Sequence, residues 1–427
     1  MELKSPAGKD SFRCRLPLFL VVSATHAAGQ AVLTMTASVW AWKLTGSALA
    51  TGTPIILSLL PAVVGSLLGT AVDLTDRRLT VSLGAGTKGV LVAWLYASAG
   101  HVSVAWIGAV VFLAGLANAV YSPAGRSVMP WLVPRDRMLS GNALVQLVKG
   151  ASAAAGLAAS SAVIGRLGVR PALGLSAALF TVSALLAWTL PRMRAEPSNA
   201  AWAFVPRLQR VASYTSELVR GFSELAGNPV LRRVVLLMGL EMLAAGPFIA
   251  FSPIYVEAVI RRPAEAAGLL LSAQQLGGAI SAAVLSWRSP NASPIGWIPR
   301  AMLGIGLSCA ALVVFPHWPG PLLYFFLLGV AVTGKSIGDE TALQTYGQAS
   351  FRGRFFAAQE AFTAVTQVLS VTAGGVLLAT LRVRWLFTLA VVLQLLAAAY
   401  GFVRLAPLAR PKEISPRGVG SLAEPDP

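Results

Sequence analysis

One carboxylate, Glu241, lies in the middle of an otherwise apolar stretch, with Leu240 and Met242 on either side. An ionisable side chain inside such a stretch costs at least about 2.5–3.5 kcal/mol on membrane-insertion scales, so these residues usually face a cavity or a partner. A buried carboxyl group can take up and release a proton. We therefore predict that Glu241 is a proton-coupling or cation-recognition residue; the alternative is a structural hydrogen bond between helices.

Two lysines, Lys149 and Lys335, also fall inside apolar stretches. Each can pair with Glu241 or receive an anionic substrate. Asp339 follows Lys335 by four residues, a spacing that suits a local ion pair on one helix face, and this favours a structural role for Lys335. For Lys149 both interpretations stay open.

Three neutral polar residues, Gln30, Asn118 and Gln274, lie in other apolar stretches. Each can hydrogen-bond a ligand or join two helices. His26 can change its charge near neutral pH, but a lone histidine is more often satisfied structurally. The three amide residues complete the set of candidate substrate and proton sites.

A phosphate-loop pattern occurs in the second half of the chain. Residues 329–336 match Gly-x-x-x-x-Gly-Lys-Ser letter for letter. A nucleotide-binding domain needs a surrounding parallel sheet and further motifs, whereas this octet sits inside an apolar segment long enough to cross a bilayer. We therefore interpret the match as coincidental.

The sequence offers no catalytic or metal-binding set. The histidines His26, His101 and His317 are scattered, and the cysteines Cys14 and Cys309 form no disulfide framework or metal-ligand spacing. No Ser/His/Asp arrangement or pair of catalytic carboxylates appears. We predict that the protein is not an enzyme and that it binds no metal and no cofactor.

The elements that carry these residues are predicted to be membrane spans. Of the 427 residues 56% are hydrophobic and 12% are charged, whereas a soluble domain averages about 25% charged. The mean hydropathy is +0.69. We predict an all-α integral membrane protein, because apolar stretches of about 17 to 25 residues recur along most of the chain. Twelve transmembrane helices are expected at 16–41, 52–72, 81–99, 103–121, 142–164, 171–190, 233–254, 266–286, 300–315, 321–341, 356–378 and 385–403.

The basic residues lie mostly between the spans on one side. With a cytoplasmic N-terminus, the inside loops and tails hold about 24 of the 34 Lys and Arg residues, and the outside loops hold about seven. The positive-inside rule therefore predicts a multi-pass protein with both termini in the cytoplasm. It also accounts for the net charge of +17 without a nucleic-acid partner.

A long polar stretch divides the chain into equal halves. We expect a first six-helix bundle at 1–191, a cytoplasmic linker at 192–232, a second six-helix bundle at 233–404 and a cytoplasmic tail at 405–427. Residues 208–225 carry apolar side chains at helical spacing, which is typical either of an amphipathic helix on the inner membrane surface or of a plain solvated linker.

An internal repeat supports the division into halves. The loop before the fifth span reads Arg135-Asp136-Arg137, and the loop before the eleventh span reads Arg352-Gly353-Arg354. Parallel repeats of this kind are one route to a transporter, with the substrate path between the two halves.

The loop between the second and third spans carries a distinctive motif. Gly65, Gly69 and Asp73 follow one another at intervals of four residues, so they share one helix face. Small residues at this spacing let another helix approach closely. Arg77 and Arg78 follow.

This loop resembles the signature of the major facilitator superfamily, Gly-x-x-x-Asp-x-x-Gly-Arg-Arg/Lys, with Gly69, Asp73, Arg77 and Arg78 matching. The second glycine of the signature is replaced by Asp76. The resemblance implies two pseudo-symmetric six-helix bundles that alternate access to a central cavity. It assigns to Asp73 and Arg77 the role of a latch between the halves.

Shorter matches resemble the branch of that superfamily that holds bacterial enterobactin-type and macrolide-type exporters. They are Leu44-Thr45-Gly46-Ser47, Pro123-Ala124 with Pro134 and Asn142, Asn228-Pro229 with Leu231-Arg232, and Gln344 with Arg352-Gly353-Arg354. The resemblance implies that spans one, four, seven and eight line the cavity, which favours Glu241, Gln30, Asn118 and Gln274 as site residues. It places span three at the periphery, so Lys88 is interpreted as structural.

Together these observations predict a secondary active transporter of the bacterial cytoplasmic membrane. The expected activity is proton-coupled efflux of a small amphipathic molecule, such as a drug, a macrolide or a siderophore, by a monomer in the lipid bilayer. Alternatives are an importer or facilitator of the same fold, and a non-transporting membrane receptor or scaffold.

Overall fold

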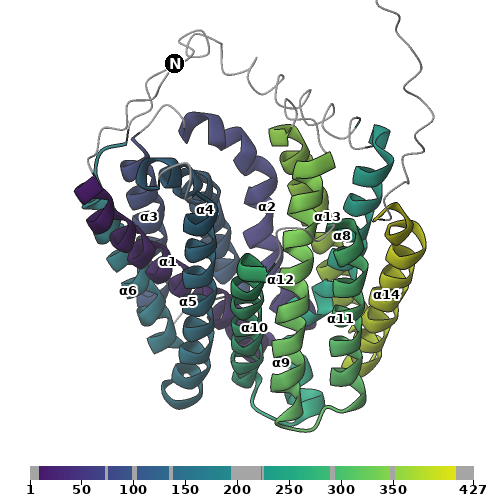
Figure 1. Cartoon of the computed structure of the whole chain (residues 1–427). Helices are drawn as coiled ribbons and strands as arrows, with labels where there is room; N and C mark the ends of the chain where they lie inside the picture. The colour runs from purple at the N-terminus through teal and green to yellow at the C-terminus, as the bar shows by residue number, and fades with distance from the viewer. Residues whose placement is uncertain are drawn as a thin grey trace, which may run out of the picture.

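The described part of the chain contains twelve long helices, whose arrangement Figure 1 shows. The computed structural model describes residues 9–72, 76–98, 103–133, 138–193, 223, 226–288, 294–346 and 352–409, and within these ranges it contains no strand. In chain order the long helices are α1 (Lys9–Thr45), α2 (Ala48–Val72), α3 (Arg77–Ala97), α4 (Val104–Leu132), α5 (Met138–Leu167), α6 (Val169–Trp188), α8 (Pro229–Ala250), α10 (Ala267–Arg288), α11 (Pro294–Val314), α12 (Gly320–Tyr346), α13 (Arg352–Leu377) and α14 (Val383–Arg404).

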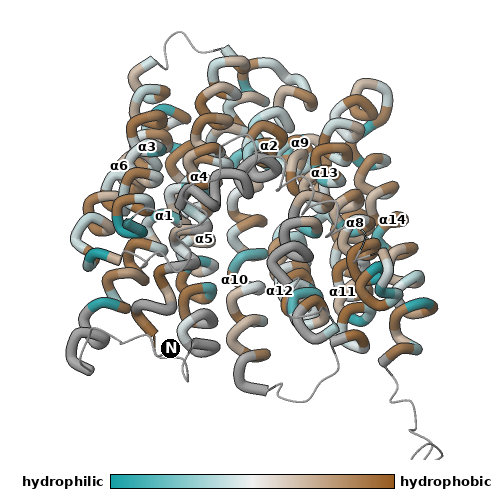
Figure 2. Tube along the Cα trace, turned by 90° about the horizontal axis from the view of Figure 1, so that it is seen from above, coloured by the Kyte–Doolittle hydropathy of each residue, from teal (hydrophilic) through white to brown (hydrophobic). Residues whose placement is uncertain are grey.

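The helices have the length and composition of membrane spans. Among the described residues ten helices are long and apolar enough to cross a bilayer, and α2 and α13 contribute the shorter apolar stretches Ala48–Pro61 and Ala361–Leu377. Figure 2 shows hydrophobic residues along all of them, with polar residues at separate points. The predicted all-α membrane fold of twelve spans is confirmed.

Several helices extend beyond the predicted spans. Helix α1 has 37 residues, whereas about 20 residues suffice to cross the hydrocarbon core. Hydropathy marks only the part of a helix that lies in hydrocarbon, and polar residues can continue the helix into the headgroup region. The predicted start at residue 16 is therefore seven residues later than the start at Lys9.

The predicted span 233–254 is not one continuous helix. Helix α8 ends at Ala250, and the short helix α9 (Ser252–Tyr255) and the π-helix η3 (Val256–Ile260) follow it. Pro253 lies in the first turn of α9, and its nitrogen carries no hydrogen to continue the preceding helical hydrogen bonds. A hydropathy pattern does not detect this break, because the residues on both sides of it are apolar.

The linker prediction falls on residues that the structure does not cover. The expected amphipathic segment 208–225 lies outside the described residues, apart from Ser223. Helix α6 ends at Trp188 and α8 begins at Pro229. The domain boundaries at 191, 232 and 404 stay predictions.

The two halves repeat one packing scheme. In the first half α1 packs on α5 and α6, α2 on α4, and α3 on α4 and α6. In the second half α8 packs on α13 and α14, α10 on α12, and α11 on α12 and α14. Each helix therefore has a counterpart six spans later, and Figure 1 shows the two bundles side by side.

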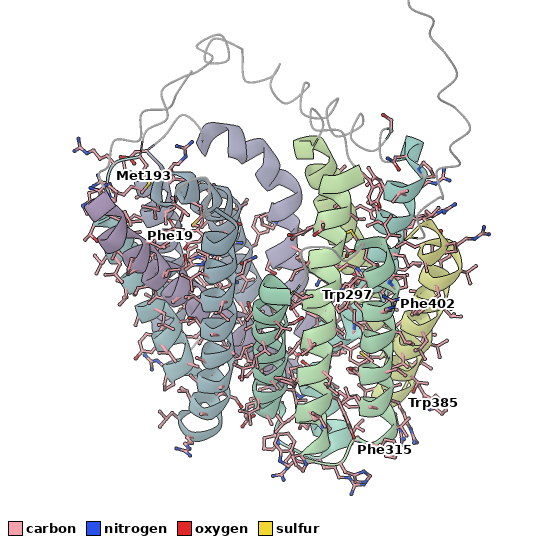
Figure 3. The ribbon with its side chains drawn as sticks, viewed as in Figure 1. Phe19, Met193, Trp297, Phe315, Trp385 and Phe402 are labelled. Atoms are coloured by element: carbon pink, nitrogen blue, oxygen red, sulfur yellow. The ribbon has the colours of Figure 1, made fainter. Side chains whose placement is uncertain are left out.

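The contacts between the halves follow the same symmetry. Helix α5 packs on α10, and its counterpart α13 packs on α2. We call the end of the bundle that holds Thr45 and Phe315 the Thr45 end, and the opposite end, where Met193 lies, the Met193 end (Figure 3).

The halves share a hydrophobic core toward the Thr45 end. One cluster of buried side chains combines Val39 and Ile55 of the first half with Phe251 and Tyr255 of the second. A separate cluster lies within the first half, around Val81 and Tyr121, and another lies within the second half. The shared core therefore closes the space between the bundles at the Thr45 end.

Backbones approach most closely between α10 and α12. A Cβ atom at Gly277 would overlap the carbonyl oxygen of Phe326, and one at Gly329 would overlap that of Gln274. Small residues at such contacts allow helices to pack closely in membranes, where dispersion and packing replace the hydrophobic effect as the force between helices. Residues 329–336 thus belong to a packed transmembrane helix.

We expect Gly277→Ala to destabilise the protein, because the added methyl group meets backbone atoms that cannot move independently. Overpacking of this kind costs about 1–3 kcal/mol. Thermal unfolding of the purified protein in detergent measures the effect. Gly86→Ala is the matched control, since its Cβ would meet only Ala184 at an ordinary 3.6 Å; equal melting temperatures for the two variants would contradict the prediction.

Candidate functional site

A buried ion triad joins α8 and α12 in the second half. Lys335 Nζ lies 2.5 Å from Glu241 Oε2 and 2.5 Å from Asp339 Oδ2. Lys335, Glu241 and Asp339 are 1%, 5% and 2% exposed, respectively. We call these three residues the acidic triad.

Helix geometry and local packing explain how the triad forms. Lys335 and Asp339 are four residues apart on α12, so their side chains share one face, and the ion pair expected from their spacing is present. Gly334 leaves room for the indole of Trp297, whose Nε1–H donates to the Gly334 carbonyl at 2.9 Å. The lysine of the phosphate-loop pattern is thus held by carboxylates within a helix, and no strand precedes it in the described chain.

The acidic triad carries more negative than positive charge. Two carboxylates face one ammonium group, and Asp339 Oδ1 is buried without a hydrogen-bond partner among the described residues. One bound proton would make the triad neutral. The sequence predicts Glu241 as a proton or cation site, which stays a prediction; the structure adds that Asp339 binds the same ammonium group.

A second polar cluster lies inside the first half and surrounds Lys88 of α3. Its Nζ donates to Gln30 Oε1 on α1 and to Asn118 Oδ1 on α4, both at 2.8 Å, and lies 3.1 Å from His26 Nε2. The lysine is 0% exposed. We call Lys88, His26, Gln30 and Asn118 the Lys88 cluster.

Aromatic rings complete the surroundings of the Lys88 cluster. The imidazole of His26 stacks on Tyr121 with the ring centroids 3.6 Å apart. Lys88 Nζ lies 5.2 Å from the ring centroid of Phe180 and 5.8 Å from that of Tyr121. Ring faces attract a cation at these distances, which adds to the attraction of the amide oxygens for an ammonium group at Lys88.

The sequence reasoning had separated Lys88 from Gln30 and Asn118. It assigned Lys88 to a peripheral span, whereas the structure brings its ammonium group to both amides. A lysine has a four-carbon stem that carries its charge far from its own backbone, so the position of a helix does not fix the position of the charge. The available signal was the lysine itself within an apolar span.

The other candidates occupy neighbouring helices. Lys149 is half-buried on α5, in the first half. Gln274 is half-buried on α10, where its backbone carbonyl packs against Gly329 of α12. The structure therefore joins Gln30 and Asn118 through Lys88 in the first half and Glu241 with Lys335 in the second, and it places Lys149 and Gln274 on the packed helices α5 and α10.

The loop motif is only partly described. Gly69 lies in α2, Asp73 falls outside the described residues, and Arg77 and Arg78 open α3. The guanidinium of Arg78 lies 5.3 Å from the ring centroid of Trp188 at the end of α6. The latch role of Asp73 and Arg77 stays a prediction.

Asp76, which replaces the second glycine of the motif, has a defined structural role. Its Oδ1 accepts hydrogen bonds from the backbone N–H groups of Arg78 and Met193, each at 3.1 Å. The first of these caps the N-terminus of α3. The second joins that terminus to the segment after α6, so Asp76 fixes the Met193 end of the first half.

Polar contacts also tie the halves together at the Thr45 end, and no sequence motif had indicated them. Trp42 Nε1 donates to Glu257 Oε2 at 2.7 Å, and Lys43 Nζ lies 3.1 Å from Glu265 Oε2. Both first-half residues end α1, and both carboxylates follow α8. These contacts adjoin the shared hydrophobic core.

Comparison with known proteins gives a consistent result. A family model described as Major Facilitator Superfamily matches residues 19–351. No curated protein matches the sequence.

Solved structures share the fold at low sequence identity. A D-xylose-proton symporter superimposes with a TM-score of 0.69 at 14% identity, covering 91% of this chain and 97% of its own. The nucleoside transporter NupG gives 0.68 at 14% identity, with 92% and 98% covered. A bacterial homologue of the human lysosomal transporter Spinster, inward-facing and unoccupied, gives 0.64 at 15% identity, with 95% and 99% covered.

The charge balance of the acidic triad predicts unequal effects of removing its members. Lys335→Met leaves two uncompensated buried carboxylates, whereas Asp339→Asn leaves one matched ion pair. Removing one partner of a buried pair costs about 3–5 kcal/mol, so we expect Lys335→Met to lower the melting temperature much more than Asp339→Asn. Thermal unfolding in detergent measures both.

A triple variant provides the control. Lys335→Met combined with Glu241→Gln and Asp339→Asn removes every charge of the triad and is expected to recover part of the lost stability. If Lys335→Met alone were as stable as Asp339→Asn, the triad would not carry the charges assigned to it.

Proposed function

Since this chain belongs to the major facilitator superfamily, we propose that it is a secondary active transporter that expels a small amphipathic molecule in exchange for protons. The observation that carries the proposal is the acidic triad. It places two carboxylates and one ammonium group in a transmembrane bundle, an arrangement with room for one exchangeable proton. Ionisable residues within spans mark proton relays and substrate paths more often than they mark simple packing.

Proton binding changes the forces between α8 and α12. With both carboxylates charged, Lys335 attracts Glu241 on α8 and Asp339 on α12. A proton on Glu241 weakens the attraction across the two helices and leaves the pair within α12 intact. Loading and release of a proton can therefore loosen and restore the contact between two helices of the second half.

The arrangement of the halves supports alternating access. The contacts between Trp42 and Glu257 and between Lys43 and Glu265 close the Thr45 end. Both termini are expected in the cytoplasm from the positive-inside rule, which makes the Thr45 end the outer one. We therefore interpret the conformation as one that is closed to the outside.

The remaining parts of the proposal come from sequence. The loop motifs resemble those of bacterial enterobactin-type and macrolide-type exporters, which favours efflux and an amphipathic substrate. We place the protein in the bacterial cytoplasmic membrane as a monomer, with Asp73 and Arg77 as the latch at the inner face. Import by the same fold and a receptor role without transport are the alternatives that the first experiment separates.

Proton exchange is tested in inverted membrane vesicles with a lactate-driven proton gradient. Macrolides, siderophores and cationic dyes are added in turn, and collapse of the gradient is recorded. We expect collapse with one class of compound, and its loss in Glu241→Gln and Asp73→Asn with each variant verified in the membrane.

The alternatives give different results in the same vesicles. Substrate uptake driven from the opposite side would indicate an importer. No response to any compound, with the wild-type protein verified in the membrane, would contradict proton-coupled export of these classes.

Closure at the Thr45 end is tested with a disulfide between α2 and α13. A Cβ atom at position 375 would lie 3.5 Å from Leu49 Cβ, within the range that a disulfide needs. In a background without Cys14 and Cys309, we expect Leu49→Cys with Gly375→Cys to cross-link and to arrest transport, because the outer end can no longer open. Reductant should restore exchange.

Leu49→Cys alone serves as the control for this experiment and should transport with or without oxidant. Full exchange by a completely cross-linked protein would show that the Thr45 end does not need to open.

A further inference from the structure

The Lys88 cluster contains a buried cation whose contacts are all neutral. Three groups surround Lys88 Nζ: Gln30 Oε1, Asn118 Oδ1 and His26 Nε2, at 2.8, 2.8 and 3.1 Å. An ammonium group has three N–H donors, so each donor has one acceptor. The arrangement therefore fits a charged lysine that is solvated by side-chain dipoles.

The first half has few carboxylates to balance this charge. Between residues 11 and 195 the chain contains three acidic residues, Asp73, Asp76 and Asp136, and all fall outside the predicted apolar spans. Asp76 is engaged in capping α3 at the Met193 end. Within the described residues no carboxylate forms an ion pair with Lys88.

Two of the acids within the spans of the second half are engaged with a lysine of their own half. Glu241 and Asp339 both bind Lys335. A protonated Lys88 therefore gives the first half a positive charge that no acidic residue within its predicted apolar spans offsets.

The internal repeat relates one residue of the Lys88 cluster to one residue of the acidic triad. The residue numbers of Arg135 and Arg352 differ by 217, and those of Asn118 and Lys335 differ by the same number. Asn118 on α4 therefore corresponds to Lys335 on α12, the central residue of the acidic triad. The two positions carry different groups, since Asn118 is a neutral acceptor for Lys88 and Lys335 is a cation that binds two carboxylates.

We propose that the Lys88 cluster is an anion-binding subsite and that the transported molecule carries a carboxylate or a similar singly charged anionic group. The proposal rests on the transport function proposed above and narrows its substrate class. Gln30 and Asn118 are partly exposed, whereas Lys88 is buried, so the two amides form the accessible face of the cluster.

The side chains of the cluster can serve both the empty and the occupied subsite. In the empty subsite the amide oxygens of Gln30 and Asn118 accept from the ammonium group. Each amide also has an NH₂ group with two donors. Rotation of an amide frees one N–H of Lys88 and turns amide donors toward the bound anion, whose charge then offsets that of the lysine.

Cysteine labelling tests both access to the subsite and the sign of its potential. The full-length protein is first freed of Cys14 and Cys309 and then given Asn118→Cys or, as a second site, Gln30→Cys. The probes are the anionic 2-sulfonatoethyl and the cationic 2-trimethylammonioethyl methanethiosulfonates, applied to inverted and right-side-out vesicles.

We expect the anionic reagent to be favoured while Lys88 is present. Lys88→Gln should lower the ratio of anionic to cationic labelling rates by about tenfold, since a nearby unit charge acts oppositely on the two reagents. Lys88→Arg keeps the charge and should keep the ratio. Arg166→Gln, which removes an exposed positive charge from the last turn of α5, is the matched control and should leave the ratio unchanged.

Two results would overturn the subsite. One is the absence of labelling at both cysteine positions from either side of the membrane, because a ligand could not reach the cluster. The other is a labelling ratio that does not respond to Lys88→Gln.

A protection experiment tests the ligand class directly. Benzoate should slow the labelling of Asn118→Cys, benzamide of the same shape should not, and Lys88→Gln should abolish the protection. Equal protection by both compounds would overturn the preference for an anion. Protection by benzoate in a protein that shows no proton exchange would support the subsite and count against the proposed transport, so the two failures are distinguishable.

Discussion

The structure depends on the cost of placing a charge where there is no water to solvate it. In hydrocarbon, unsatisfied polar groups cost several kcal/mol each, so every ionised side chain within the bundle needs partners from the protein. The two halves meet this requirement in different ways. In the second half two carboxylates surround Lys335, and in the first half neutral amides, an imidazole and ring faces surround Lys88. The two solutions leave opposite excess charges in the two bundles.

Symmetry in packing therefore does not extend to chemistry. The contacts of α1 to α6 are repeated by α8 to α14, and Asn118 and Lys335 occupy corresponding positions in the repeat. A repeated scaffold provides equivalent positions in the two halves at which polar side chains face neighbouring helices. The residue types at a few of these positions then determine the charge of the polar cluster in each half. One half can therefore hold a lysine between two carboxylates and the other a lysine among neutral partners without a change in the fold.

The sequence was sufficient for the features that depend on local pattern. Hydropathy located the twelve spans, and the four-residue spacing indicated the pair of Lys335 and Asp339. The hydropathy pattern did not detect the break at Pro253, because the flanking residues are equally apolar. The sequence could not identify the partner of Glu241 or predict the contact between Lys88 and Asn118, because these contacts depend on distances between helices. The contacts at the Thr45 end were missed for the same reason, since Glu257 and Glu265 stand in a segment without a recognisable motif.

The strengths of these interactions determine which contacts can break during a cycle of transport. Breaking a buried pair by removing one partner costs about 3–5 kcal/mol, whereas an exposed ion pair contributes about 0–1 kcal/mol. The Lys43 side chain is 43% exposed and that of Glu265 15%, so their pair is closer to the second class. The acidic triad and the Lys88 cluster each lie within one half and can move with it intact. The polar contacts between the halves at the Thr45 end are the weaker ones, which makes that end the place where two rigid bundles can separate and meet again.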